Sequence, residues 1–129
     1  MYEYAVTKIC KIVDGDTVDL LIDLGFSIHI KERVRMHGID APESFTSDLN
    51  EKKFGIEAKE FLENWLNAQT ALTIKTYKDD KYGRILGKIY GDSGVCVNDL
   101  MVEQGYAWIY DRKSKSKDFD VLIEKRKIK

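Results

Sequence analysis

The chain has 129 residues, of which 43% are hydrophobic, and its formal net charge at pH 7 is −1. This length favours one domain over residues 1–129 with one hydrophobic core, and the charge argues against a broadly basic nucleic-acid-binding surface. No apolar run reaches the roughly 20 residues of a membrane helix, and no signal-like segment follows Met1. We therefore expect a cytoplasmic protein without membrane contact, or a secreted one if a signal peptide was removed.

The charge is distributed unevenly along the chain. Residues 111–129 carry eight Lys and Arg against four Asp and Glu, which leaves the first 110 residues at −5. We interpret this basic C-terminal segment as a solvated helix face, with phosphate contact as the alternative.

Alternating apolar and polar residues predict three strands at the start of the chain. They cover residues 4–13, 17–23 and 28–36, and Asp14-Gly15-Asp16 forms the turn of the first hairpin. The polar stretch 44–53 has no periodic apolar residues, which predicts a long mobile loop. In the third strand, one face would carry Ile28, Ile30, Val34 and Met36, and the other would carry His29, Lys31 and Arg35.

Helices and further strands are predicted for the rest of the chain. Apolar residues at helical spacing indicate an amphipathic helix over residues 51–68, with Phe61 and Trp65 in the core rather than stacked on bases. A second helix over 98–104 would be capped by Asn98 and stopped by Gly105. Strands are expected at 71–77, 85–90 and 95–97, and a last helix at 118–127.

This order of elements predicts an α+β architecture that is mainly β. Most of the strands would close into a small Greek-key barrel. Periodicity alone does not separate that barrel from an open antiparallel sheet.

Three turns carry the charged residues that suggest chemistry: 14–17, 35–43 and 80–84. In the middle one, Arg35 ends a strand, and Pro42 separates Asp40 from Glu43. A phosphate-binding cation, a hard oxygen ligand and a second carboxylate thus lie within nine residues. Each turn taken alone is more typical of an ordinary hairpin or loop.

Taken together and in this order, the three turns resemble those of the staphylococcal nuclease (thermonuclease) family. The likeness runs from about Ile12 to Ala107 and includes the helix start Phe54-Gly55-Ile56-Glu57-Ala58 and the segment 97–105. It implies a five-stranded barrel of the oligonucleotide/oligosaccharide-binding (OB) type with about three helices. It also implies a Ca²⁺-dependent, sugar-non-specific nuclease acting on DNA and RNA. We expect the protein to be a monomer.

The resemblance further implies roles for single residues. Ca²⁺ would be bound by the carboxylates of Asp16 and Asp40 and by the backbone carbonyl of Ala41, where the family often has Thr. These are the hard oxygen ligands that Ca²⁺ prefers. Arg35 and Arg84 would hold the scissile phosphate. Glu43 would activate or orient water. Substrate would also be bound by Lys81, Tyr82 and Tyr110.

A binding module is the alternative from a different class. Domains related to this family keep the barrel, lose the catalytic set, and bind nucleic acid or protein. The presence of all five charged side chains favours the enzyme.

Overall fold

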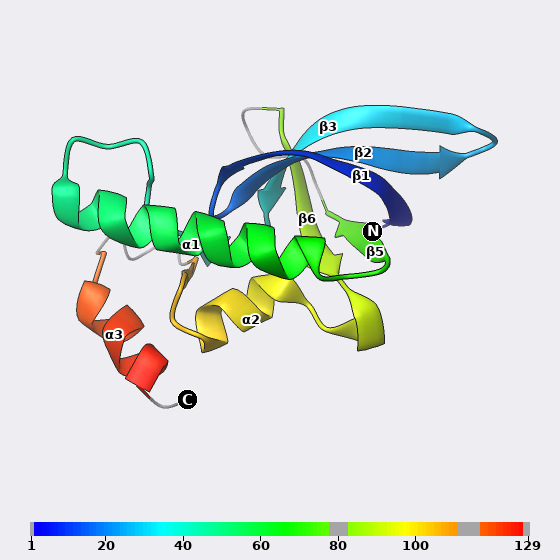
Figure 1. Ribbon diagram of the computed structural model, residues 1–129. Helices are drawn as coiled ribbons and strands as arrows, with labels where there is room; N and C mark the ends of the chain where they lie inside the picture. The colour runs from blue at the N-terminus through cyan, green and yellow to red at the C-terminus, as the bar shows by residue number, and fades with distance from the viewer. Residues whose placement is uncertain (1, 78–82, 111–116, 128–129) are drawn as a thin grey trace.

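The computed structural model describes residues 2–77, 83–110 and 117–127 (Figure 1). In chain order, its elements are β1 (Tyr2–Asp14), β2 (Thr17–Gly25), β3 (Ile28–Met36), β4 (Ile39–Asp40), α1 (Leu49–Asn67), β5 (Leu72–Thr76), β6 (Ile85–Tyr90), the short 3₁₀ turn η1 (Asp92–Gly94), α2 (Val97–Glu103), β7 (Trp108–Ile109) and α3 (Phe119–Lys127).

Five of the described strands form a closed barrel in the order β1-β2-β3-β6-β5, and β5 pairs back onto β1. Neighbouring strands are antiparallel except β3 and β6, which are parallel. This is the strand order of an OB-type Greek-key barrel. Closure confirms the predicted barrel and rules out the open sheet that the periodicity had left possible.

The long strand β1 makes closure possible because it pairs on both of its edges. Residues 2–6 pair with β5, while residues 5–14 pair with β2. The pairing with β2 has three register shifts, and bulges of this kind bend and twist a strand. The core inside the barrel includes Val18, Leu20, Ile22, Val34, Met36, Ile74 and Ile89, each at most 1% exposed.

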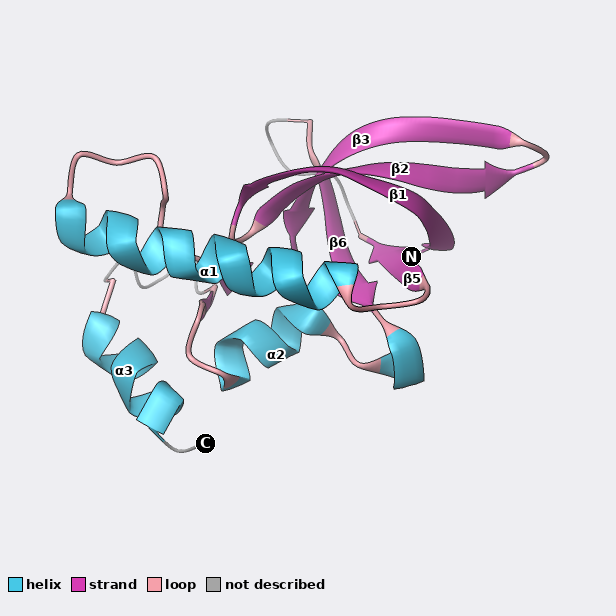
Figure 2. Ribbon diagram, in the orientation of Figure 1, coloured by secondary structure: helices cyan, strands magenta, loops and turns pink. Residues whose placement is uncertain are grey.

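The three α-helices lie on one side of the barrel (Figure 2). α1 buries Ala58, Leu62 and Leu66 against the core, and Phe61 and Trp65 pack beside them, as predicted. α3 joins this layer through the buried Leu122 and through Phe119, whose ring lies 4.9 Å from that of Phe54. Within the described part of the chain, no helix is both long enough and apolar enough to cross a bilayer.

Several predicted boundaries were wrong. α1 begins at Leu49, because the side chain of Asp48 accepts hydrogen bonds from the backbone N–H groups of Asn50 and Glu51. The predicted loop over 44–53 therefore ends at Asp48. The predicted strand over 95–97 is reduced to a single bridge between Tyr90 and Cys96.

The caps of α2 were predicted only in part. The helix begins at Val97, and Asn98 does not cap it, since its side chain is turned into the core. Gly105 does end this segment with a φ of +83°. The short strands β4 and β7 were not predicted at all.

Candidate active site

Three of the predicted site residues, Asp16, Arg35 and Asp40, come together where the turn after β1 meets the end of β3. The backbone N–H of Met36 donates to the carbonyl of Asp16 at 2.8 Å, which holds this turn against β3. Arg35 pairs with Thr17 in the register of β2 and β3, and Asp40 follows in β4. The sheet register thus places two segments of the predicted site side by side.

Arg35 lies between the two aspartates. Its Nη2 is 3.5 Å from a carboxylate oxygen of Asp16 and 3.5 Å from one of Asp40. Its Nη1 donates to the carbonyl of Met36 at 3.0 Å, which orients the guanidinium. The side chains of Arg35 and Asp16 are 15% and 13% exposed, whereas that of Asp40 is 40% exposed. Asp40 is therefore the more open of the two carboxylates.

Asp16 is fixed by two further hydrogen bonds. One carboxylate oxygen accepts from the backbone N–H of Ala41 at 2.9 Å, and the other accepts from the Thr17 hydroxyl at 3.0 Å. Asp16 therefore orients the peptide that follows Asp40. The carboxylate of one turn and the backbone of the next form one unit.

Negative charge is concentrated at Asp40. Burial raises the pKa of its carboxyl group, Asp16 and Glu43 raise it further, and Arg35 and Lys117 act in the opposite direction. All four charges are thus close enough to act on Asp40. The structure brings Asp16, Arg35 and Asp40 together, and Glu43 follows three residues after Asp40.

Glu43 is exposed, but its backbone is held by residues that the sequence reasoning missed. Its N–H donates to the carboxylate of Glu51 at 3.1 Å, and Lys117 Nζ lies 2.6 Å from the same oxygen. The next N–H, of Ser44, donates to Asp14 at 3.1 Å. Glu51 was predicted as the first residue of a helix and also stood within the predicted loop 44–53, and no local signal marks a helix carboxylate that accepts from a backbone N–H eight residues earlier.

Two glycines let α1 approach the site loops closely. A Cβ built at Gly55 would overlap the carbonyl of Glu43 and would lie 2.6 Å from the nitrogen of Ser44. A Cβ at Gly15 would lie 2.8 Å from that of Ala58 and 2.9 Å from that of Ala41. The small residues of the Phe54–Ala58 motif therefore set the position of the loop that carries Glu43.

The segment that carries Asp40 is braced from the other side. β4 pairs with β7, with Asp40 opposite Trp108. The side chain of Asn98, fully buried, donates to the carbonyls of His37 at 2.9 Å and Gly87 at 3.0 Å, and accepts from the N–H of Ile89 at 3.1 Å. This amide joins α2, β6 and the turn before Asp40, a role that the N-cap prediction missed.

The remaining predicted residues are less closely tied to this centre. Arg84 directly precedes β6, two residues before Leu86, which pairs with Arg35. Tyr110 is 53% exposed, and its N–H donates to the carbonyl of Gly38 at 2.9 Å. Lys81 and Tyr82 lie outside the described residues.

A hard cation is the kind of metal ion this edge would suit, because its side-chain donors are carboxylates. Among residues 2–77, 83–110 and 117–127, no group of three or more His, Cys, Asp or Glu side chains is arranged to hold a metal. Any ion here would depend on Asp16, Asp40, backbone carbonyls, water and substrate.

A closed OB-type barrel with an arginine between two carboxylates at its edge defines a small domain suited to phosphate and a hard cation. The comparison with protein families makes the assignment specific. A family model described as "Staphylococcal nuclease homologue" matches residues 33–127. The chain belongs to the staphylococcal nuclease family, and the class of enzyme that this family name denotes is a nuclease, a hydrolase.

Curated relatives carry related names. The chain is 30% identical over 105 residues to an "Uncharacterized endonuclease" of Escherichia coli, covering 81% of this chain and 61% of the relative. It is 32% identical over 119 residues to a "Micrococcal nuclease" of Shigella flexneri, covering 86% and 62%. "Endonuclease YhcR" of Bacillus subtilis is 31% identical over 126 residues, which cover 88% of this chain and 10% of that protein. The chain thus spans less than two thirds of these relatives.

Proposed function

We propose that this chain is a Ca²⁺-dependent, sugar-non-specific nuclease that hydrolyses phosphodiester bonds of DNA and RNA. The observation that carries the proposal is the position of Arg35, with Nη2 3.5 Å from the carboxylates of both Asp16 and Asp40 at the barrel edge. The family and the relatives named as nucleases support the same class of reaction.

The residues present at this edge fit Ca²⁺. Asp16 and Asp40 offer carboxylate oxygens, and Ala41 offers a backbone carbonyl, whereas Ca²⁺ takes about six to eight oxygen ligands in flexible geometry. The pKa of Asp40 is raised by burial and by Asp16, so a cation beside Asp40 would offset the repulsion. When bound, Ca²⁺ would supply positive charge that polarises the phosphate.

The protein's own residues would position the substrate and the water. Arg35 and Arg84 would bind the oxygens of the scissile phosphate, where planar guanidinium groups match the geometry of the developing charge. Glu43, exposed on a braced backbone, would orient the attacking water, because a carboxylate is a weak base at neutral pH. We assign substrate binding beyond this centre to Lys81, Tyr82 and Tyr110, and propose that the protein acts as a monomer.

Cleavage assays with and without the metal test this proposal. Plasmid DNA and RNA should both be cleaved in Ca²⁺ and left intact in EGTA. Arg35→Lys should lower kcat roughly 10²-fold, as loss of an electrostatic donor does in other hydrolases. The matched control is Lys53→Arg, an exposed change on α1 that should leave the rate unchanged. Cleavage that persists in EGTA, or no cleavage by the unaltered protein, would refute the proposal.

An OB-type module that binds nucleic acid or protein without cleaving it is the second candidate. Its supporting observation is that the described residues hold no three-carboxylate metal cluster. Glu43→Gln separates the two functions. A nuclease should lose most of its rate, whereas a pure binding module should bind as before and show no hydrolysis in either form.

A further inference from the structure

A group of basic side chains lies on the outer face of β1, β2 and β3. The cross-strand row Ile12, Val18 and Val34 is buried, which fixes the side that faces the core. Successive rows alternate between the two faces. The outer rows are therefore Lys11, Asp19 and Arg33, followed by Lys8, Leu21 and Lys31. We call Lys8, Lys11, Lys31 and Arg33 the sheet-face cations.

Most of the positive charge on this face is not neutralised by Asp19. Arg33 binds that carboxylate through two hydrogen bonds, of 2.8 Å and 3.1 Å, so one pair of charges cancels. The hydrogen bond from Arg33 is the largest cause of the lowered pKa of Asp19, and Lys31 and Lys11 lower it further. Both lysines therefore act on the centre of the face. All four sheet-face cations are exposed.

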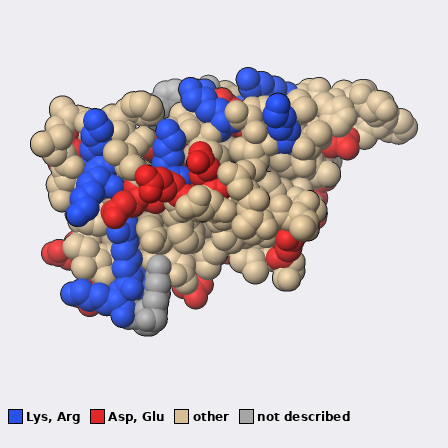
Figure 3. All heavy atoms as spheres, viewed as in Figure 1, with Lys and Arg blue, Asp and Glu red and all other residues tan. Residues whose placement is uncertain are grey.

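This gathering of charge runs against the composition of the chain. The first 110 residues carry a net charge of −5, yet two adjacent outer rows place four cations around one carboxylate. Lys and Arg atoms gather over these strands in Figure 3. A local positive surface on an acidic background attracts a polyanion to one place rather than to the whole molecule.

The face is continuous with the candidate active site. The next outer row toward that end contains Asp14, Thr17 and Arg35. Arg35, Arg33 and Lys31 are therefore successive outer residues of β3, in steps of about 7 Å. Such steps are comparable to the distance between successive phosphates of an extended strand, and single-strand-binding proteins follow the backbone with rows of cations.

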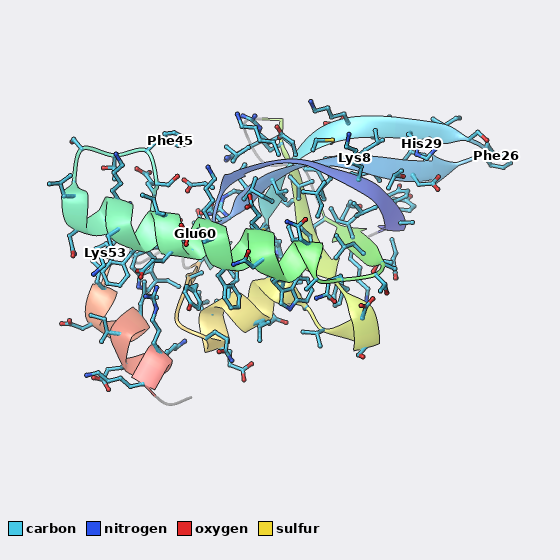
Figure 4. All side chains as sticks on the ribbon, in the orientation of Figure 1. Lys8, Phe26, His29, Phe45, Lys53 and Glu60 are labelled. Atoms are coloured by element: carbon cyan, nitrogen blue, oxygen red, sulfur yellow. The ribbon has the colours of Figure 1, made fainter. Side chains whose placement is uncertain are left out.

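The far end of the same arm carries an exposed aromatic ring. Phe26, at the tip of the β2–β3 hairpin, is 98% exposed, and Figure 4 shows Lys8 and His29 along the arm that leads to it. An exposed aromatic side chain can stack on any unpaired base, because every base has a π face. This favours a single strand over a duplex as the occupant of the arm.

We propose that the outer face of β1–β3 binds the single-stranded part of the nucleic acid beyond the scissile phosphate, with Lys8, Lys11 and Lys31 contacting its phosphates. This inference rests on the proposed nuclease function for its choice of ligand. It adds a second contact region, which serves long substrates and is not used by a dinucleotide.

Salt dependence of binding tests the proposal directly. The triple variant Lys8→Gln, Lys11→Gln and Lys31→Gln is compared with the unaltered protein by fluorescence anisotropy of a labelled single-stranded oligonucleotide without Ca²⁺. The slope of log K against log salt should become shallower by about 2, because each phosphate of a single strand that is neutralised by a lysine accounts for roughly 0.7 of the slope. The matched control, Lys53→Gln, Lys125→Gln and Lys127→Gln, makes the same change in charge on α1 and α3 and should leave the slope unchanged.

Two results would overturn the proposal: an unchanged slope in the sheet-face variant, or an equal change in both variants.

Cleavage assays separate this proposal from the nuclease function. The sheet-face variant should keep kcat/KM on a dinucleotide and show a raised KM on a long strand. A normal KM on both substrates refutes the sheet-face contact while the nuclease stands. A shallower slope without any cleavage supports the contact and refutes the nuclease.

Discussion

Asn98 shows at the scale of one residue how the site depends on a distant side chain. Its amide is a hydrogen-bond partner of the carbonyls of His37 and Gly87 and of the N–H of Ile89, which come from two separate segments. Buried backbone groups are costly to leave without a partner, so this side chain determines where the turn before Asp40 can lie.

Replacing Asn98 with Leu should destabilise the protein by about 2 kcal/mol or more, because the carbonyl of His37 and the N–H of Ile89 would each lose a partner at about 1–3 kcal/mol, whereas the carbonyl of Gly87 keeps the N–H of His37. Chemical denaturation of the variant measures this loss. Asn64→Leu, on the exposed face of α1, is the control and should change stability by less than about 0.5 kcal/mol. Equal effects in the two variants would contradict the role given to Asn98.

His37 gives a prediction for pH. Burial lowers the pKa of His37, and Lys88 lowers it further, while the ring stacks on Tyr77 at 4.4 Å. The pKa of His37 is lower in the folded state than the unfolded-state value of about 6.5, so the neutral ring stabilises the folded protein above about pH 6.5. This contribution is lost as the pH falls through the folded-state pKa. His37→Gln should therefore lose less stability than the unaltered protein between pH 7 and pH 5.

Thermal unfolding at both pH values measures the effect. The matched control is His29→Gln, since His29 is exposed on the hairpin arm, where it hydrogen-bonds Thr7. If His37→Gln and the unaltered protein lose the same stability on acidification, the burial of His37 does not contribute to the acid response.

At the scale of elements, α1 sets the position of both site loops. It contacts one loop through Gly55 and the other through Ala58, which lies against Gly15 and, through it, near Ala41. The helix therefore acts as a common support for the carboxylate turn and for the loop of Glu43. A small shift of α1 would separate the two halves of the site.

Gly55→Ala should reduce activity more than stability. The added methyl group overlaps the Glu43 backbone, and such overpacking costs about 1–3 kcal/mol, partly offset by the better helix propensity of Ala. We expect kcat to fall tenfold or more while the protein remains folded by circular dichroism. Lys53→Ala, two residues earlier on an exposed position, should leave kcat unchanged. Unchanged kcat in Gly55→Ala would show that the loop position is not critical.

At the scale of the whole molecule, the rest of the fold must offset the electrostatic repulsion between the carboxylates of the candidate site. The carboxylates of Asp16 and Asp40 share one arginine at 3.5 Å, and burial raises the pKa of Asp40. A raised carboxyl pKa stabilises the folded state at acidic pH, and the contribution is lost as pH rises through the folded-state value. If the proposed function is right, these carboxylates are retained there at a cost in stability.

Asp40→Asn should raise the melting temperature at neutral pH without metal, and this gain should shrink below about pH 4, where aspartate is protonated. At a hundredfold excess over Kd, Ca²⁺ should stabilise the unaltered protein by roughly 2.7 kcal/mol and so raise its melting temperature. It should leave the melting temperature of the variant unchanged. Glu60→Gln, on the exposed face of α1, is the control for loss of one carboxylate. Equal stabilisation of both proteins by Ca²⁺ would remove Asp40 from the proposed ligands.

The barrel strands, the amphipathic face of α1 and the charged turns could be predicted from the sequence, because periodicity and turn residues are local properties of the chain. The resemblance of these turns to a known family pointed to Asp16, Arg35, Asp40 and Glu43, and the structure brings the first three together. Periodicity left an open sheet possible, because closure depends on β5 pairing back onto β1.

The tertiary structure alone also revealed Glu51, Lys117 and Asn98 as supports of the site, and the outer rows of β1–β3 as one basic face. Each depends on contacts between residues far apart in the chain, such as Asn98 with His37 or Lys117 with Glu51. A polar residue in a helix has the same sequence pattern whether its partner is water or a distant backbone. The packing of strands and helices against one another decides which partner it contacts.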